Sequence, residues 1–254
     1  MPDPTRVLVA GDWHGRTSWA FSVLRRLPEL LPGGSTRIVL HLGDFGVWPG
    51  GDHYLNAVDR YLEEAGAVLW FVDGNHEDFS QLNRIPLYDG MGAVTDRIWH
   101  LPRGYRWKWH DRTWLALGGA VSVDRALRAP GETWWPDEEI TQGQARRAAD
   151  DGHADVMVCH DAPSWVPLNL PAPPSLWAPE DLRRANKHRG RLQDVVDEVQ
   201  PSHLLHGHYH LAHRTDVDMH YGTCHVTGLD CDGSAHNYDV LNVQTMQWEG
   251  ARRA

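Results

Sequence analysis

Three short apolar runs in the first third of the chain each end abruptly in a polar cluster. Residues 6–10 lead into Gly-Asp-Trp-His, residues 37–42 lead into Gly-Asp, and residues 68–72 lead into Asp-Gly-Asn-His-Glu. Short apolar runs of this kind predict buried strands. In open α/β sheets, ligands gather at the carboxyl ends of the strands. We therefore expect five side chains to share one crevice: Asp12, His14, Asp44, Asn75 and His76.

The segments beside these runs have the pattern of helices. Residues 17–27 are amphipathic and are followed by Pro28, which cannot continue a helix. Residues 53–64 precede the third run, and residues 77–83 follow it. The order strand, helix, strand, helix, strand implies a parallel sheet with right-handed crossovers.

The pattern changes after Pro86. Residues 96–101, 105–109 and 113–117 are short aromatic and β-branched runs separated by turn residues. Runs of this kind are typical of an antiparallel meander. We therefore expect a second group of strands in the middle of the chain.

Two later strand-like runs also end in polar clusters. Residues 154–159 lead into His160, and residues 202–205 lead into a histidine-rich segment that contains His208 and His210. These three histidines follow strand ends in the same way as the first five candidates. We expect them in the same crevice.

The remaining segments complete the predicted fold. Acidic residues that complement the helix dipole predict a helix over residues 137–150, and a second helix is expected over residues 191–199. Residues 162–179 contain six prolines, which predicts a surface loop or lid. Residues 224–229 and 238–243 have the pattern of closing strands.

Length and composition limit the class of protein. The 254 residues, of which 41% are hydrophobic and 23% charged, suit a single domain over residues 1–254. The net charge of -10 argues against broad contact with a nucleic-acid backbone. Three cysteines without a CxxC pair, and an N-terminus without a signal-peptide pattern, favour a reducing compartment. We expect a cytoplasmic protein that does not span a membrane.

The eight candidate side chains have the chemistry of metal ligands. Together they supply carboxylate, imidazole and amide oxygen in roughly the number that two divalent ions require. Taken singly, Asp12 could cap a helix and Asn75 could belong to a turn. Their joint order along the chain favours a metal site instead.

In order, the set reads Asp-x-His, Gly-Asp, Gly-Asn-His-Glu, His and Gly-His-x-His between residues 12 and 210. This order resembles the signature of the calcineurin-like metallophosphoesterase superfamily. The tryptophan-rich middle resembles its small bacterial or phage members. The resemblance implies a four-layer α/β/β/α sandwich, hydrolysis of phosphoesters and two divalent metal ions. Manganese is the expected metal, with iron, zinc, nickel, cobalt and magnesium as alternatives.

The resemblance also implies a role for each residue of the set. The first metal ion would be held by Asp12, His14, Asp44 and His210. The second would be held by Asp44, Asn75, His160 and His208, so that the Asp44 carboxylate bridges the two ions. A hydroxide shared by the ions would attack phosphorus. His76 would be the catalytic residue that stabilises developing charge or protonates the leaving oxygen.

Departures from well-known branches of the superfamily narrow the expected substrate. Asp44 is followed by Phe45 and Gly46, without the VDRG continuation of Ser/Thr protein phosphatases, which argues against that activity. The expected substrates are small phosphodiesters, with cyclic nucleotides as candidates, or phosphomonoesters. A nuclease acting on RNA or DNA ends and a non-catalytic binding scaffold are the alternatives. The sequence leaves the substrate-binding residues and the oligomeric state open.

Several other residues allow two interpretations. Glu77 and Asp161 either orient imidazoles or are ordinary caps. Arg125 either reaches a substrate phosphate or forms a surface salt bridge. His41 lies in an apolar run, which favours a hydrogen-bonded core residue. The tryptophans between the motifs either stack on a base or pack loops: Trp134, Trp135, Trp165 and Trp177. Histidines without a motif partner are expected to face solvent: His53, His110, His188, His213, His220, His225 and His236.

Overall fold

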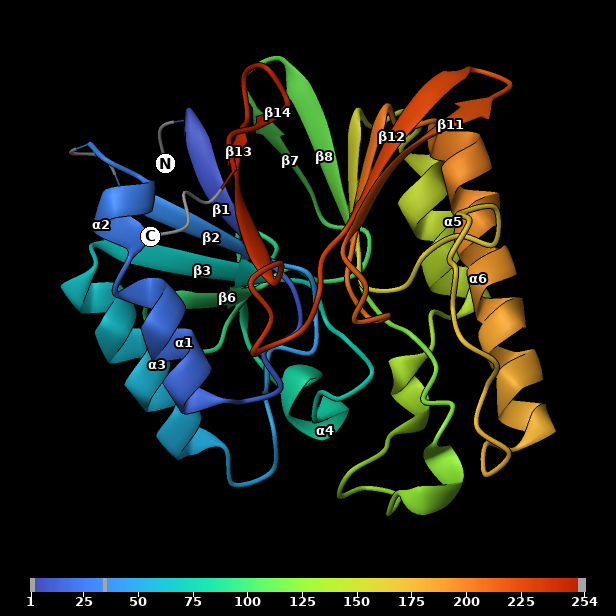
Figure 1. Cartoon of the computed structure of the whole chain (residues 1–254). Coiled ribbons are helices and arrows are strands. Elements are labelled where there is room, and N and C mark those ends of the chain that lie inside the picture. The colour runs from blue at the N-terminus through green and yellow to red at the C-terminus, as the bar shows by residue number, and fades with distance from the viewer. Residues whose placement is uncertain (1–2, 34–35, 251–254) are drawn as a thin grey trace.

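The chain folds into four layers (Figure 1). The computed structural model describes residues 3–33 and 36–250. Two β-sheets face each other in the middle of the molecule, and helices cover the outer face of each sheet. This architecture is the predicted α/β/β/α sandwich. Within the described residues, none of the helices is both long enough and apolar enough to cross a membrane.

The first sheet has eight strands in the order β14-β13-β1-β2-β3-β6-β5-β4. Its centre is parallel and consists of β1 (Arg6–Ala10), β2 (Arg37–His41), β3 (Ala67–Phe71) and β6 (Ile98–His100). Its margins are antiparallel and consist of β13 (Tyr238–Asn242), β14 (Gln247–Trp248), β5 (Met91–Ala93) and β4 (Leu87–Tyr88). The parallel order of β1, β2 and β3 confirms the prediction. The predicted meander is wrong at its first strand, because β6 pairs in parallel with β3.

The second sheet has six strands in the order β11-β12-β10-β9-β8-β7. Its parallel centre consists of β8 (Arg112–Leu117), β9 (Val156–Cys159), β10 (His203–His206) and β12 (Gly222–Gly228). Antiparallel strands form its edges, β7 (Arg106–Trp109) and β11 (His213–Met219). Both sheets therefore direct the carboxyl ends of several parallel strands toward one region.

The helices divide between the two outer layers. The first sheet is covered by α1 (Thr17–Leu24), α2 (Leu27–Leu30) and α3 (Asp52–Glu64), and the second by α5 (Gln142–Asp150) and α6 (Pro179–Val199). The short helix α4 (Phe79–Leu82) follows β3. The first helix ends at Leu24 rather than at residue 27, and Pro28 lies in the first turn of α2. Two later helices begin far from the predicted residue. The helix α5 begins late because Thr141 and Gln144 form a capping box. The helix α6 begins early because Pro179 suits the first helical turn.

Alternating side chains of the central strands build two different cores. In β1, Leu8 packs toward the helices of the first layer, whereas Val7 and Val9 pack between the two sheets. Four tryptophans fill much of the space between the sheets: Trp70, Trp107, Trp109 and Trp114. The core between the sheets thus fixes the position of the strand ends that carry the candidate residues.

The end of β1 is held by a buried asparagine near the C-terminus. Asn237 is fully buried, and its side-chain oxygen accepts hydrogen bonds from the indole N–H groups of Trp13 (3.0 Å) and Trp19 (2.7 Å). Its backbone oxygen accepts a hydrogen bond from the N–H of Gly11 (2.7 Å). These contacts flank Asp12 on both sides and tie the segment after β1 to the loop before β13.

Asn237→Ala is expected to lower the free energy of unfolding by about 3 kcal/mol, because it leaves two indole donors without an acceptor. Urea denaturation followed by tryptophan fluorescence measures this change. Asn56→Ala, at an exposed position of α3, is the matched control and is expected to leave stability unchanged or to raise it by less than about 1 kcal/mol, because alanine favours the helix. Equal stability of the two variants would contradict the role of Asn237.

Candidate metal centre

The structure brings all eight candidate side chains together where strands of both sheets end. Asp12 follows β1, Asp44 follows β2, and Asn75 and His76 follow β3. From the second sheet, His160 follows β9, and His208 and His210 follow β10. Residues that are far apart in the sequence meet because the parallel strands of the two sheets end at the same place (Figure 1).

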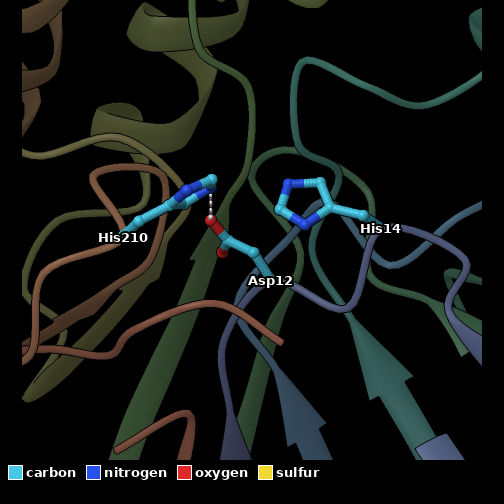
Figure 2. A group of neighbouring side chains, drawn as sticks. All are labelled: Asp12, His14 and His210. Carbon is cyan, nitrogen blue, oxygen red and sulfur yellow. Dashed lines mark ion pairs between the residues drawn. The ribbon is translucent and has the colours of Figure 1, made fainter. Parts of the chain in front are cut away.

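The first group of donors consists of Asp12, His14 and His210. One donor atom from each of these residues lies within 4.8 Å of the others. Figure 2 shows the Asp12 carboxylate between the two imidazoles, with its ion pair to His210. The Nε2 atom of His210 lies 3.3 Å from Oδ2 of Asp12. His210 is half-exposed, so this group opens toward solvent.

The second group consists of Asp44, His160 and His208, and it lies deeper in the protein. The Nε2 atom of His160 lies 3.3 Å from Oδ2 of Asp44 and 3.3 Å from Oδ1 of Asn75. The ring centroids of His160 and His208 are 5.0 Å apart. The amide oxygen of Asn75 thus faces the same space as the carboxylate and the imidazoles.

Asp44 connects the two groups. Its Oδ2 atom lies 3.5 Å from Nε2 of His14, in addition to the contact with His160 from the second group. A third set of donors that overlaps both groups consists of His14, Asp44 and His76. The Asp44 carboxylate therefore faces imidazoles from both sheets.

Strained backbone holds several of these side chains in place. His14, Asp44, His208 and His210 have positive φ angles of 47°, 50°, 69° and 50°. This left-handed conformation costs a residue other than glycine about 1 to 3 kcal/mol, and it occurs most often at functional sites. Half of the eight candidates adopt it, which indicates that the fold positions these side chains at the expense of local stability.

Two glycines allow the backbone to lie close to the carboxylates of Asp44 and Asp12. A Cβ atom on Gly74 would lie 2.1 Å from Oδ1 of Asp44, and one on Gly207 would lie 2.3 Å from Oδ1 of Asp12. Neither Gly74 nor Gly207 has a positive φ angle, so the role of glycine at these two positions is to leave room for a carboxylate oxygen.

Hydrogen bonds from the far side of the rings orient two of the imidazoles. The Nδ1 atom of His160 lies 2.7 Å from the carbonyl oxygen of Leu42, and Nδ1 of His14 lies 3.0 Å from Oδ1 of Asp232. In each case Nδ1–H donates outward, so that Nε2 faces Asp44. Imidazoles that bind metal ions are usually oriented in this way. The donor set therefore fits a divalent ion.

Asn75 is oriented by residues that follow β8. Its side-chain N–H donates to the hydroxyl of Ser122 (3.1 Å), and this hydroxyl donates to Oε2 of Glu138 (2.6 Å). Because the amide nitrogen is engaged on one side, the amide oxygen must face His160. Ser122 and Glu138 are both buried, so the arrangement is shielded from water.

The electrostatics of the centre are dominated by the two buried carboxylates. Burial opposes a charge on His160, but Asp44 and Asp12 outweigh it and raise the pKa of His160 to about 10. Burial also opposes a charge on His14, and the nearby carboxylates raise its pKa to about 9. Burial lowers the pKa of His208 to about 4. Two protonated imidazoles therefore compensate the two carboxylates at neutral pH when no metal ion is bound.

Of the two acids next to the motifs, Glu77 supports the backbone and Asp161 orients an imidazole. Glu77 accepts hydrogen bonds from the backbone N–H groups of Phe45 (2.7 Å) and Val47 (2.8 Å), so it supports the turn after Asp44. Asp161 accepts hydrogen bonds from Nδ1 of His188 (2.7 Å) and from the hydroxyl of Tyr209 (2.5 Å). Asp161 therefore orients an imidazole, but not that of a candidate ligand.

Some histidines outside the motifs are buried. His188 is fully buried against Asp161, so the expectation that it faces solvent is wrong. His41 lies in the core as predicted, but neither ring nitrogen has a hydrogen-bond partner among the described residues. It packs against Trp13 and Phe45 instead, and burial lowers its pKa to about 3.

An arginine that the sequence did not single out lies at the centre. Nη1 of Arg128 is 2.6 Å from Nδ1 of His76, and its Nη2 is 3.1 Å from Nε2 of the same ring. Arg125 instead pairs with the buried Asp181 at 2.7 Å, so it forms a salt bridge as the second interpretation held, but a partly buried one rather than one at the surface. Among the tryptophans, Trp135 packs in the core, whereas Trp134 lies beneath the Arg125 guanidinium.

Four residues of the site were not predicted from the sequence, and only two of them follow a pattern that could have identified them. Ser122 and Asp232 each follow the end of a strand, β8 and β12, so the rule that identified the motifs applies to them as well. Arg128 and Glu138 lie in the segment between β8 and α5, and no pattern in the sequence distinguishes them from charged residues at the surface.

Comparisons with known proteins agree with this geometry. A sequence profile described as calcineurin-like phosphoesterase matches residues 5–212. No curated protein matches the sequence. The fold is similar to TT1561 of Thermus thermophilus, with 12% identity, a TM-score of 0.55 and coverage of 97% of each chain. A predicted phosphoesterase from Streptococcus pneumoniae has 12% identity and a TM-score of 0.39, over 93% of this chain and 82% of that chain.

At 12% identity, the similarity to TT1561 shows the fold alone, whereas the sequence profile covers most of the chain. The matched range extends over every motif between Asp12 and His210. The chain therefore belongs to the calcineurin-like phosphoesterase family.

Proposed function

We propose that this protein hydrolyses small phosphoesters with the help of two divalent metal ions. The position of Asp44 is the observation that carries the proposal. Its buried carboxylate lies within 3.5 Å of Nε2 of His14 and within 3.3 Å of Nε2 of His160. A carboxylate between two sets of imidazoles is the arrangement that two ions with a shared ligand require.

The ligand sets follow from this position. We assign Asp12, His14, Asp44 and His210 to the first ion, and Asp44, Asn75, His160 and His208 to the second. Carboxylate, imidazole and amide donors without a thiolate suit manganese, iron or zinc, and we propose manganese. When bound, the ions supply positive charge for the phosphoryl oxygens and lower the pKa of a water molecule that can attack phosphorus.

His76 supplies a hydrogen bond in this proposal. Burial lowers its pKa, Asp44 acts against this effect, and Arg128 lowers the pKa further, so the ring is neutral at neutral pH. A neutral imidazole accepts one hydrogen bond and donates one. Arg128 can only donate, and its shorter contact is with Nδ1 (2.6 Å), so we place the ring proton on Nε2, the nitrogen that lies 3.8 Å from Oδ2 of Asp44. His76 then donates it in a hydrogen bond to a substrate oxygen, which stabilises developing charge.

The substrate class rests on the surface charge and on the loop after Asp44. A net charge of -10 opposes long contact with a polyanion, which favours a small ester over a nucleic acid. The residues after Asp44 differ from the pattern of Ser/Thr protein phosphatases, which disfavours a phosphoprotein substrate. We therefore favour a small phosphodiester, with cyclic nucleotides as candidates, over a phosphomonoester. We also propose that the reaction takes place in the cytoplasm.

The manganese-loaded protein is expected to hydrolyse bis-p-nitrophenyl phosphate. Asp44→Ala removes the shared ligand and is expected to lower kcat/KM by at least about a hundredfold, the upper range for the loss of a supporting group at a metal site. Release of p-nitrophenolate measures the rate. Asp111→Ala changes an exposed acid in the turn between β7 and β8 and is the control with unchanged activity.

This assay, repeated with oligonucleotides and combined with a measurement of manganese binding, distinguishes a phosphoesterase from a nuclease and from a binding scaffold. Full activity of metal-loaded Asp44→Ala would contradict the shared-carboxylate site. Cleavage of oligonucleotide ends without cleavage of small esters would identify a nuclease. A protein that binds manganese but hydrolyses none of the small esters or oligonucleotides would be a binding scaffold.

Metal binding is expected to release protons. The pKa values of His14 and His160 are raised to about 9 and about 10, so both rings are protonated at neutral pH and must lose a proton to bind an ion. About two protons should leave per protein at pH 7, and the apparent affinity for Mn2+ should rise with pH up to about pH 10, where His160 loses its proton. Calorimetric titration in buffers with different ionisation enthalpies counts these protons.

The exposed His53 provides the control for this count, because His53→Gln should leave the number of released protons unchanged. An affinity for Mn2+ that does not depend on pH between about 6 and 9 would contradict the assignment of His14 and His160 as ligands.

A further inference from the structure

The irregular segment between β8 and α5 places an arginine beside the candidate metal centre. In Figure 1 this segment, coloured green to yellow-green, lies on the same side of the molecule as α4. Arg128 follows its 3-10 turn (Arg125–Leu127) and contacts His76. We propose that Arg128 binds a phosphoryl oxygen of the substrate, an inference that rests on the proposed phosphoesterase function.

One edge of the Arg128 guanidinium is fixed by a carboxylate. Nε donates to Oδ1 of Asp124 (2.7 Å), and Nη2 donates to Oδ2 of the same residue (2.8 Å). Paired hydrogen bonds of this kind are strong and set the plane of the guanidinium. The side chain is only 17% exposed. Arg128 is therefore held in position before any ligand binds, which lowers the entropy cost of binding.

The other edge has more donors than acceptors. It contacts both ring nitrogens of His76, at 2.6 and 3.1 Å, and Nη1 also donates to the backbone oxygen of Thr133 (3.3 Å). A guanidinium has only donors, a neutral imidazole has one acceptor, and a protonated imidazole has none. Whatever the protonation state of His76, at least one N–H of Arg128 that faces the ring has no acceptor there. A shielded, charged donor without an acceptor is unfavourable, and an anionic oxygen would satisfy it.

The location of this donor identifies the kind of anion. The Nε2 atom of His76 lies 3.8 Å from Oδ2 of Asp44, so one imidazole ring separates Arg128 from the carboxylate that connects the two donor groups. A phosphoryl group placed at that carboxylate by metal ions has oxygens next to His76. Arginine suits such oxygens because its N–H groups are directional and it remains charged at every relevant pH.

Arg125 begins the 3-10 turn that Arg128 follows, but its environment is different. Its Nε donates to the fully buried Asp181 at 2.7 Å, and its guanidinium lies over the ring of Trp134. Its charge is therefore occupied by a structural ion pair away from His76. A change at Arg125 tests the effect of removing a positive charge from this segment without removing the proposed contact.

The test measures binding of inorganic phosphate to the manganese-loaded protein by calorimetry. Arg128→Gln is expected to weaken phosphate binding by about tenfold to a hundredfold, the range for a lost hydrogen bond to a charged group. Arg128→Lys keeps the charge but cannot make the same paired contact with Asp124, so an intermediate loss is expected. Arg125→Gln should remain within about twofold of the wild-type affinity.

Thermal unfolding of each variant shows whether the protein folds. If Arg128→Gln does not fold, phosphate binding by Arg128→Lys tests the proposal instead. A folded Arg128→Gln or Arg128→Lys protein with wild-type phosphate affinity would overturn the proposal, even if the wild-type protein hydrolyses phosphoesters. Phosphate binding that depends on Arg128, in a wild-type protein that hydrolyses no ester, would support this site and contradict the proposed function.

Discussion

The burial of two carboxylates is the constraint on which the rest of the structure depends. Asp12 and Asp44 are 0% and 2% exposed, and a carboxylate in such a place is costly unless opposite charge lies beside it. In the protein without metal ions, protonated His14 and His160 supply this charge, as their raised pKa values indicate. Divalent ions can replace these protons. The strained backbone at His14 and Asp44 persists because the surrounding sheets hold it.

Residues outside the motifs complete the arrangement. Asp232 orients His14, and Ser122 orients Asn75, so that the ligand atoms face the shared carboxylate. Asp232 and the buried Asn237 lie beyond the range of the family match, which ends at residue 212. The C-terminal segment is therefore a structural part of the centre, since it holds both the end of β1 and the imidazole that follows it.

Much of the architecture could be predicted from the sequence, because short apolar runs with polar ends mark buried parallel strands. The same pattern identified the eight candidate side chains that converge. The pairing of β6 could not be read in this way, since a short aromatic run fits either orientation and tertiary packing decides between them. The position of Arg128 could not be predicted from the sequence either, because its contact with His76 depends on the path of an irregular segment.

The central claim is that Asp44 is shared by two metal ions. Crystals grown with Mn2+ and measured at the manganese absorption edge test it directly, because anomalous scattering locates each ion. The account predicts two peaks roughly 3.5 to 4 Å apart, one on each side of the Asp44 carboxylate and in contact with the two assigned ligand sets. A single peak, or peaks that do not contact Asp44, would contradict it.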